Sequence, residues 1–357
     1  MFTSRDGSIL KMPIGGSDTS LKDKNFSYFT YSREAIVEIL TSNRIGPDDE
    51  VILPNYLCSN VIESIIPVTK NIKYYKIDDC LSFENSEVIS LITDKTKLIM
   101  FVDYFGIQTK IDKDVVLALK IRDILIVKDA AHSFLSLVND GFTKDYDYDY
   151  LISSIYKNLP IQVGSIAIGK FNGRFEFINF SILVKRFLIL VFKNILCFLG
   201  LQRHINRSSS QISVSDSYPV SYFYGPNAIK FFKALLFRLN LKKIISDKQE
   251  IMEKFNSFFA NSLVCKPVFT ERKLDNNILQ VYPIMFNDQL DRDEMLNFLR
   301  NNCIDAYTWP TFHETNCDDI FLWSRILLLP LDLKVLEAFH KFLLLKKKNT
   351  TKHSSAR

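Results

Sequence analysis

The sequence predicts an α/β protein whose largely parallel sheet is covered by helices on both faces, followed by a smaller C-terminal α+β domain. Apolar strands alternate with helical segments from residue 33 to residue 129, and a second run of strands and helices occupies 266–345. Alternation of this kind requires crossover connections, which make neighbouring strands parallel. A chain of 357 residues is long enough for two unequal domains. We predict a large domain over 1–240, a small domain over 241–345 and a disordered basic tail over 346–357.

The first half of the chain supplies the alternation. A helix is predicted near 33–43, a short strand at 50–53, a helix around 59–66 and a strand at 71–77. A strand at 97–106, a helix near 111–122 and a strand at 124–129 follow. Ligands of such sheets bind beyond the carboxyl ends of the strands. Because Asp129 ends one of these strands and Asp103 lies near the end of another, we expect a crevice near Asp129.

The second half is less regular. Residues 207–219 are polar and predict a surface loop, 227–239 and 244–263 predict helices, and 278–286 predicts a strand before a helix at 291–301. Residues 178–201 are apolar enough to cross a bilayer. However, Lys185, Arg186 and Lys193 interrupt them, and a charge in mid-bilayer costs roughly 2.5 kcal/mol or more. We predict a buried or interface helix there rather than a membrane-surface helix, and we expect no membrane contact.

Composition excludes several classes of protein. Hydrophobic residues make up 47% and charged residues 24% of the chain, which is typical of globular proteins. The net charge of +5 equals the number of basic residues in 346–357, so the body is neutral and no nucleic-acid partner is expected. The six cysteines form no CxxC pair and the five histidines show no ligand spacing, so we expect neither disulfides nor a metal site. The N-terminus lacks the apolar core of a signal peptide, which favours the cytoplasm.

Three short stretches carry candidate chemistry: TYSREAI (30–36), KDAAHS (128–133) and SSIYKNLP (153–160). The first places a hydroxyl and an arginine where a turn enters a helix, which suits a phosphate, although an ordinary serine cap would look the same. Asp129 needs a cation or several donors if it is buried, and either a protonated pyridine nitrogen or the next turn could supply them. Lys157 lies in a charge-poor region, which favours Schiff-base chemistry, although most lysines are simply solvated.

In this order, the three stretches resemble the DegT/DnrJ/StrS-like nucleotide-sugar aminotransferases, a family of fold-type I pyridoxal-phosphate enzymes. The resemblance covers nearly the whole chain and is weakest between 171 and 225. It also includes IGG at 14–16, LPNYLC at 53–58, YFG at 104–106, AYTWP at 306–310 and LLLPLD at 327–332. The resemblance implies a fold-type I architecture, pyridoxal 5'-phosphate as the cofactor and a homodimer with its sites at the subunit interface.

The resemblance also implies roles for individual residues. Lys157 would hold the cofactor as a Schiff base and, once released, move the proton between carbon atoms. Asp129 would pair with the pyridine nitrogen and keep it protonated. His132 stands where the family commonly has glutamine or histidine near the ring hydroxyl.

The remaining implied contacts concern the phosphate and the ring face. Ser154 would bind the phosphate together with Ser32 and Arg33. The family often has glycine in this turn and a large aromatic residue over the ring, where this chain has Cys58, so Tyr56 is the candidate substitute. A glycine pair after the lysine is reduced to Gly164–Ser165, and the arginine-containing stretch that reaches the neighbouring subunit has no counterpart in this sequence.

The function implied is transamination, with glutamate as donor and a nucleotide-linked keto-sugar as acceptor, for cell-surface polysaccharides such as O-antigen or related amino sugars. Two alternatives remain. One is a pyridoxal-phosphate-dependent sugar modification of another type, such as dehydration, although we expect dehydrating relatives to carry histidine in place of Lys157. The other is a catalytically inactive member that binds a sugar nucleotide or a protein partner.

Overall fold

The computed structural model describes residues 21, 25–142, 148–159, 161, 163–171, 175–198, 212–213, 226–269, 274, 276–313, 315 and 321–354. The glycine pair at 14–16 and most of the predicted loop at 207–219 lie outside these ranges. The elements, in chain order, are β1 (Ser27–Phe29), α1 (Ser32–Ser42), β2 (Glu50–Pro54), α2 (Ser59–Ile65), β3 (Ile72–Tyr75), α3 (Asn85–Ser90), β4 (Thr96–Val102), α4 (Lys113–Ile121), β5 (Leu125–Asp129), α5 (Phe134–Asn139), β6 (Tyr150–Ser154), α6 (Ile155–Asn158), β7 (Ser165–Gly169), β8 (Glu176–Phe177), α7 (Phe180–Phe198), β9 (Ile212–Ser213), α8 (Pro226–Leu236), α9 (Leu241–Phe259), β10 (Cys265–Pro267), β11 (Tyr282–Phe286), α11 (Gln289–Asn301), β12 (Phe312–His313), α12 (Phe321–Arg325), β13 (Ile326–Leu329) and α13 (Leu333–Ser354).

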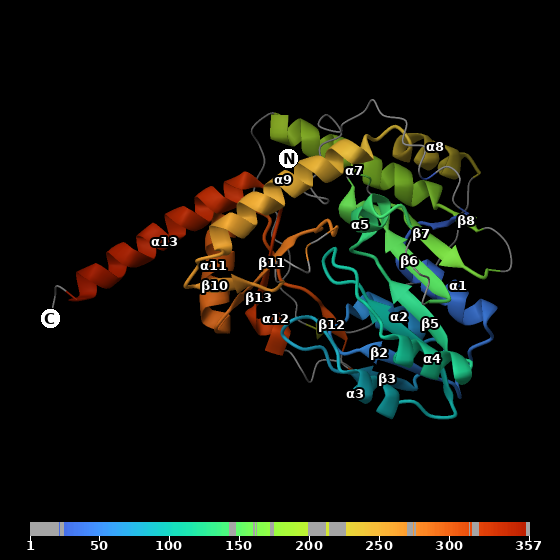
Figure 1. Cartoon of the computed structure of the whole chain (residues 1–357). Coiled ribbons are helices and arrows are strands. Elements are labelled where there is room, and N and C mark those ends of the chain that lie inside the picture. The colour runs from blue at the N-terminus through green and yellow to red at the C-terminus, as the bar shows by residue number, and fades with distance from the viewer. Residues whose placement is uncertain are drawn as a thin grey trace.

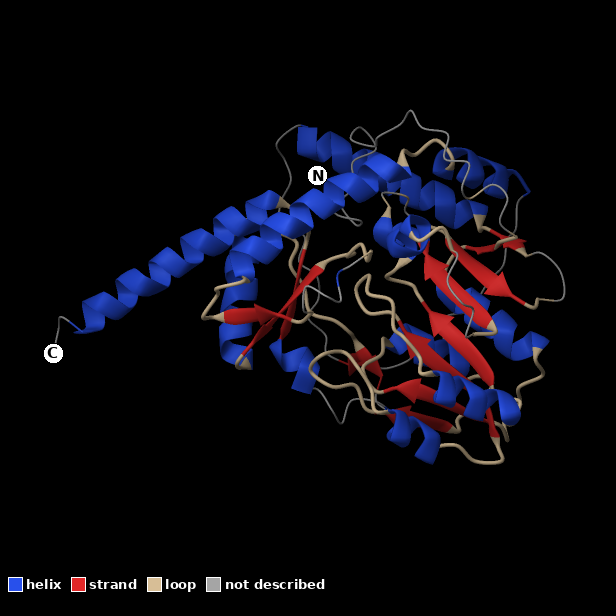
Figure 2. Cartoon of the chain, in the orientation of Figure 1, coloured by secondary structure: helices blue, strands red, loops and turns tan. Residues whose placement is uncertain are grey.

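The large sheet has the strand order β3-β2-β4-β5-β6-β7-β1-β8 (Figures 1 and 2). Strands β3, β2, β4, β5 and β6 are mutually parallel, and β7 is antiparallel to both of its neighbours, β6 and β1. The prediction of a largely parallel sheet within an α/β fold is confirmed. The carboxyl ends of β4, β5 and β6 therefore lie along one edge, as the sequence pattern requires.

Alternation along the strands divides the buried side chains between two cores. In β6, Leu151 packs in a cluster with side chains of α5, α8 and α9, whereas the next residue, Ile152, packs in a cluster with side chains of α1, α2 and α4. Successive strand residues point to opposite faces, so both faces must be apolar to be covered by helices. This burial explains why the strands appear in the sequence as continuous apolar runs rather than as alternating ones.

The first strand pairs with strands that come much later in the chain. β1 lies between β7 and β8, with Phe29 opposite Ser165 in the antiparallel register. β7 also pairs with β6, where Ser165 lies opposite Ser154. This arrangement brings the turn after β1, the end of β6 and the start of β7 to one place, and the candidate site lies there.

A second, antiparallel sheet has the order β10-β11-β13 and packs with α9 and α11, and α13 packs in turn against these two helices. It lies within the range predicted for a small domain. However, one cluster of buried apolar side chains continues from the large sheet to this one, so the division into domains stays a prediction. The last helix, α13, continues to Ser354 and differs from the disordered tail predicted from residue 346. Lys346 bonds Asp291 and Glu294 of α11, which ties the start of that segment to the fold.

Within the apolar segment 178–201, residues Phe180–Phe198 form a helix, α7. Much of it is exposed, so of the two predicted alternatives, a buried helix and an interface helix, the first does not hold for that part. Beyond its first turns it carries side chains such as Leu188 and Phe192 that are 60% and 61% exposed. The first turns pack on the fold through the buried Leu183 and the partly buried Ile182. The apolar composition of this helix therefore does not arise from burial in the core of this chain.

Candidate active site

Asp129 is the last residue of β5 and is 6% exposed. One carboxylate oxygen, Oδ1, accepts a hydrogen bond of 3.0 Å from the Ala131 N–H. Burial raises the pKa of Asp129 above its usual value, while a positive charge on Lys157 and the Ala131 N–H act in the opposite direction. A buried carboxylate with so few donors is stabilised by a nearby cation. Asp129 and Lys157 therefore lie close enough to interact, as the sequence analysis predicts.

Lys157 belongs to the short helix α6, directly after β6. Its Nζ lies 3.3 Å from Nε2 of His132, a buried residue in the turn after β5. The other ring nitrogen, Nδ1, accepts a hydrogen bond of 3.3 Å from the Phe105 N–H. Because Nδ1 accepts, the proton of the neutral imidazole lies on Nε2 and points at Lys157. Nε2 of His132 and Nζ of Lys157 thus face each other across this contact.

An aromatic wall surrounds His132. The Phe105 ring stacks on the imidazole with an interplanar angle of 8° and a centroid distance of 5.5 Å. Trp309, which precedes β12, meets the imidazole edge-on at 5.1 Å and also contacts the rings of Phe105 and Tyr104. Aromatic pairs of these geometries each contribute about 0.5–1.5 kcal/mol beyond area burial. The wall fixes the orientation of His132, and therefore of the atom that faces Lys157.

Tyr56 is part of this wall, whereas Cys58 lies to one side. Tyr56 is buried, its ring packs edge-on against Trp309 at 5.1 Å, and its hydroxyl donates to the Trp309 carbonyl. Cys58 caps α2, is half-buried and accepts a weak hydrogen bond of 3.5 Å from the Asn60 amide. Tyr56 is therefore connected to His132 through Trp309. Nothing in the described residues brings Cys58 against Lys157.

Three serine hydroxyls converge at the start of α6, the short helix that carries Lys157. Ser32 Oγ, at the first position of α1, lies 2.6 Å from Ser154 Oγ and 2.9 Å from Ser165 Oγ. Ser154 and Ser165 are buried at the paired ends of β6 and β7. Hydroxyls and a helix N-terminus together form a common type of phosphate site. Ser32 and Ser154 were candidates from the sequence, while Ser165 completes the cluster.

Glu34 and Arg33 flank the serine cluster on α1. Oε2 of Glu34 accepts hydrogen bonds from the N–H groups of Thr30 (2.9 Å) and Tyr31 (3.5 Å), which holds the turn before the helix. Burial raises the pKa of Glu34 to about 7, so the carboxyl holds a proton more readily than an exposed glutamate. Arg33 lies over the Tyr31 ring at 4.8 Å and donates to Asn60 of α2. These two contacts connect Arg33 to Tyr31 and to α2.

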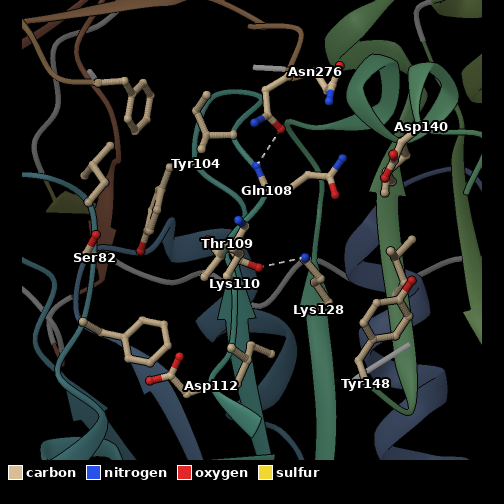
Figure 3. A pocket seen from close by; sticks show the side chains of 18 of the residues that line it. Ser82, Tyr104, Gln108, Thr109, Lys110, Asp112, Lys128, Asp140, Tyr148 and Asn276 are labelled. Carbon is tan, nitrogen blue, oxygen red and sulfur yellow. Dashed lines mark hydrogen bonds between the residues drawn. The ribbon is translucent and has the colours of Figure 1, made fainter. Parts of the chain in front are cut away.

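A separate cavity of about 930 Å³ lies beside β5 (Figure 3). Lys128 and Leu151 line it, and they occupy paired positions whose side chains face away from Asp129. Figure 3 shows Lys128 directed at the Thr109 carbonyl, at 3.0 Å. Nζ also lies 3.4 Å from Oδ1 of the fully buried Asp103. This pair fixes the loop after β4, because Oδ1 of Asp103 accepts from the Thr109 N–H at 2.7 Å.

Two site residues carried too little signal to be assigned from the sequence. Ser165 follows Gly164 and was noted only as the remnant of a glycine pair, and its position beside Ser154 depends on the antiparallel pairing of β6 and β7. Trp309 belongs to the AYTWP stretch, but its aromatic partners lie in the first half of the chain. The only sign of a role for Trp309 in the sequence was that it belongs to AYTWP, one of the stretches that carry the family resemblance.

Residues 30–146 match the model of the DegT/DnrJ/EryC1/StrS aminotransferase family. The matched range covers 117 of the 357 residues and agrees with the resemblance predicted from the sequence. Members of this family are pyridoxal-phosphate-dependent aminotransferases, and the matched range contains Ser32, Asp129 and His132. The resemblance to this family that the sequence predicts is confirmed over this range, and so is pyridoxal phosphate as the cofactor that it implies. The roles of the individual side chains in this aminotransferase stay predictions.

Solved structures with this fold include several aminotransferases. A putative sugar aminotransferase, Spr1654 from Streptococcus pneumoniae, in its PMP form, is 20% identical with a TM-score of 0.62, over 92% of this chain and 93% of that one. PseC of Helicobacter pylori, an aminotransferase involved in pseudoaminic acid biosynthesis, is 16% identical with a TM-score of 0.60, over 91% and 87%. DesV of S. venezuelae, in complex with a ketimine intermediate, is 14% identical with a TM-score of 0.61, over 89% and 84%. At these identities the likeness establishes the fold, which is that of fold-type I pyridoxal-phosphate enzymes.

Proposed function

We propose that this chain is a cytoplasmic, homodimeric sugar aminotransferase that moves an amino group from glutamate to a keto-sugar carried by a nucleotide, for cell-surface polysaccharide such as O-antigen. The observation that carries the proposal is the convergence of Lys157, His132 and Asp129 next to three serine hydroxyls. The sugar class is supported by the structural neighbours named as sugar aminotransferases. The glutamate donor and the nucleotide follow from the sequence resemblance alone.

The residues present fit pyridoxal phosphate. Asp129 offers a buried carboxylate that needs a cationic partner, which suits a protonated pyridine nitrogen. Ser32, Ser154 and Ser165 offer hydroxyl donors at the N-terminus of α1, which suits the phosphate. The raised pKa of Glu34 limits the negative charge beside that phosphate.

Pyridoxal phosphate supplies an aldehyde that bonds the substrate amine and a ring that withdraws electrons from the adjacent carbon. The residues of the chain would move the proton, position the amine and exclude water. Nζ of Lys157, released from the cofactor by the substrate, would accept the proton from the substrate carbon and return it to the product side. His132 would hold that amine in position through Nε2. Trp309 and Tyr56 would exclude water from one side of the site.

The test is a titration of the purified protein with pyridoxal phosphate, followed by visible absorption. We expect a band from covalently bound cofactor in the wild type and its loss in Lys157→Ala. Lys120→Ala, which removes an exposed lysine of α4, is the matched control and should keep the band. Wild-type protein without such a band would leave only the inactive, ligand-binding alternative.

A second measurement tests the reaction itself. Glutamate added to the loaded wild type should release one equivalent of 2-oxoglutarate per site, and the amino group should then pass to a nucleotide-linked keto-sugar. Loaded protein that binds the sugar nucleotide but releases no 2-oxoglutarate would contradict glutamate as the donor. Asp129→Asn should still bind cofactor but slow the release by a factor of about 100 or more, because an amide does not keep the pyridine nitrogen protonated.

A further inference from the structure

Helix α7 carries a stripe of exposed apolar side chains along its length. Each of its large members is at least 38% exposed, and apart from one adjacent pair they follow one another at intervals of three or four residues, which is the spacing of one helical face. We call this set the α7 stripe. Its members are Phe180, Val184, Phe187, Leu188, Phe192 and Ile195.

The stripe continues onto the neighbouring helix α8. Phe231 of α8 is 48% exposed, and its ring lies 6.3 Å from that of Phe187. Side chains of this size cover about 200 Å² each, so half-exposed members together present on the order of 600 Å². That value is at the upper end for the largest apolar patch of a monomer, and patches of this size mark interaction sites. Figure 1 places α7 and α8 together along one outer side of the molecule.

The charges around the stripe have one sign. Neither α7 nor α8 contains an aspartate or glutamate, and the sequence has none between Phe177 and Ser215. Lys185 is exposed at the edge of the stripe, three residues before Leu188 and seven before Phe192. Lys230 is exposed beside Phe231 on α8. An apolar helix face with a basic edge has the composition of helices that lie in the membrane interface.

Two binding partners for this face can be compared, namely a second copy of this chain and an anionic lipid surface. A second copy of this chain, related by a two-fold axis, would place the same basic face against itself with no acidic residue on either helix to pair with it. The stripe also presents less than the roughly 800 Å² per partner of a standard interface. An anionic lipid surface complements both the apolar stripe and the basic edge. Among the described helices none is long and apolar enough to cross a bilayer, so α7 would lie along the surface.

We propose that the face formed by α7 and α8 binds the surface of an anionic phospholipid bilayer, with the α7 stripe inserted at the level of the headgroups. The side chains inserted would be those of the stripe, led by Leu188 and Phe192, which are the most exposed. The proposal is independent of the reaction, because none of these residues contacts Lys157 or the serine cluster in the described structure.

The test is sedimentation of the full-length protein with phosphatidylcholine vesicles, with and without phosphatidylglycerol. We expect the wild type to bind the anionic vesicles and to bind neutral ones more weakly. The double substitution L188E/F192E should weaken binding by about tenfold or more. K185Q and K230Q should each weaken it by about fivefold on anionic vesicles only. L117E, which alters an equally exposed leucine of α4, is the matched control and should bind as the wild type does.

Light scattering and thermal unfolding of the same variants distinguish membrane binding from self-association and from a loss of folding. Because the two introduced carboxylates would be solvated in the unbound protein, L188E/F192E should unfold at the wild-type temperature and keep the wild-type mass. Loss of half the mass in L188E/F192E, without vesicle binding by the wild type, would assign the stripe to a second copy and overturn the proposal. Wild-type protein that stays in the supernatant with both kinds of vesicle would overturn it as well.

Discussion

Gly106 provides a sharp test of how the site is supported. Its φ is +113°, and a Cβ built there would lie 2.3 Å from the Ile278 carbonyl oxygen and 2.7 Å from the Leu279 Cα. Those backbone atoms cannot move freely, because the Gln280 N–H donates to the Phe105 carbonyl at 2.7 Å. The backbone conformation costs a non-glycine residue about 1–3 kcal/mol, and overpacking adds about 1–3 kcal/mol. We therefore expect Gly106→Ala to lower the free energy of unfolding by about 4 kcal/mol.

For a chain of this size, such a loss lowers Tm by roughly 5 °C, which thermal unfolding followed by circular dichroism measures directly. The affinity for pyridoxal phosphate should fall as well, because Phe105 precedes Gly106 and stacks on His132. Gly46→Ala is the control, since its Cβ would meet only Asp49 Oδ2, at 3.9 Å. A Gly106→Ala protein that unfolds at the same temperature as Gly46→Ala would refute the reasoning.

Three further substitutions test other parts of the fold and site. Lys128→Met should cost about 3–5 kcal/mol in urea unfolding, because it leaves Asp103 charged and buried, and adding Asp103→Asn should recover most of that loss. If the double variant were no more stable than Lys128→Met, the ion pair between Lys128 and Asp103 would be contradicted. Glu34→Gln should flatten the pH dependence of unfolding: between the unfolded pKa near 4.5 and the folded value of about 7, folded chains hold a proton that unfolded chains release, so wild-type stability falls as pH rises through that window. Identical slopes for the two proteins would show that Glu34 does not titrate there. Trp309→Ala should cost about 3 kcal/mol and weaken cofactor binding about tenfold, measured by absorption titration, because the ring that orients His132 is lost. Unchanged binding would mean that Phe105 alone orients the imidazole.

Local signals allowed much of the fold to be predicted. Continuous apolar runs at 97–102 and 124–129 marked buried parallel strands, and Asp129 at the end of one run marked the crevice. The order of the three short stretches along the chain then supplied the family and the cofactor. The strand β1 was not predicted, because three residues carry no readable period and its partners come from β7 and β8.

The features that the sequence could not supply depend on pairings between distant segments. Ser165 gains its place from the antiparallel register with Ser154, and no pattern within its own strand encodes that register. The exposure of Phe192 also depends on which distant segments pack beside its helix. The composition of 178–201 left a buried and an interface helix open, whereas the elements packed beside α7 decide which of its sides is covered.

The hydroxyls of Ser32 and Ser154 are 122 residues apart in the chain. During synthesis on the ribosome, the turn that bears Ser32 emerges long before the strands that will border it, and β1 has no sheet to join until β7 has been made. The cofactor can therefore reach a finished pocket only late in translation. We therefore expect the chain to need chaperones most while β1 is exposed and still unpaired.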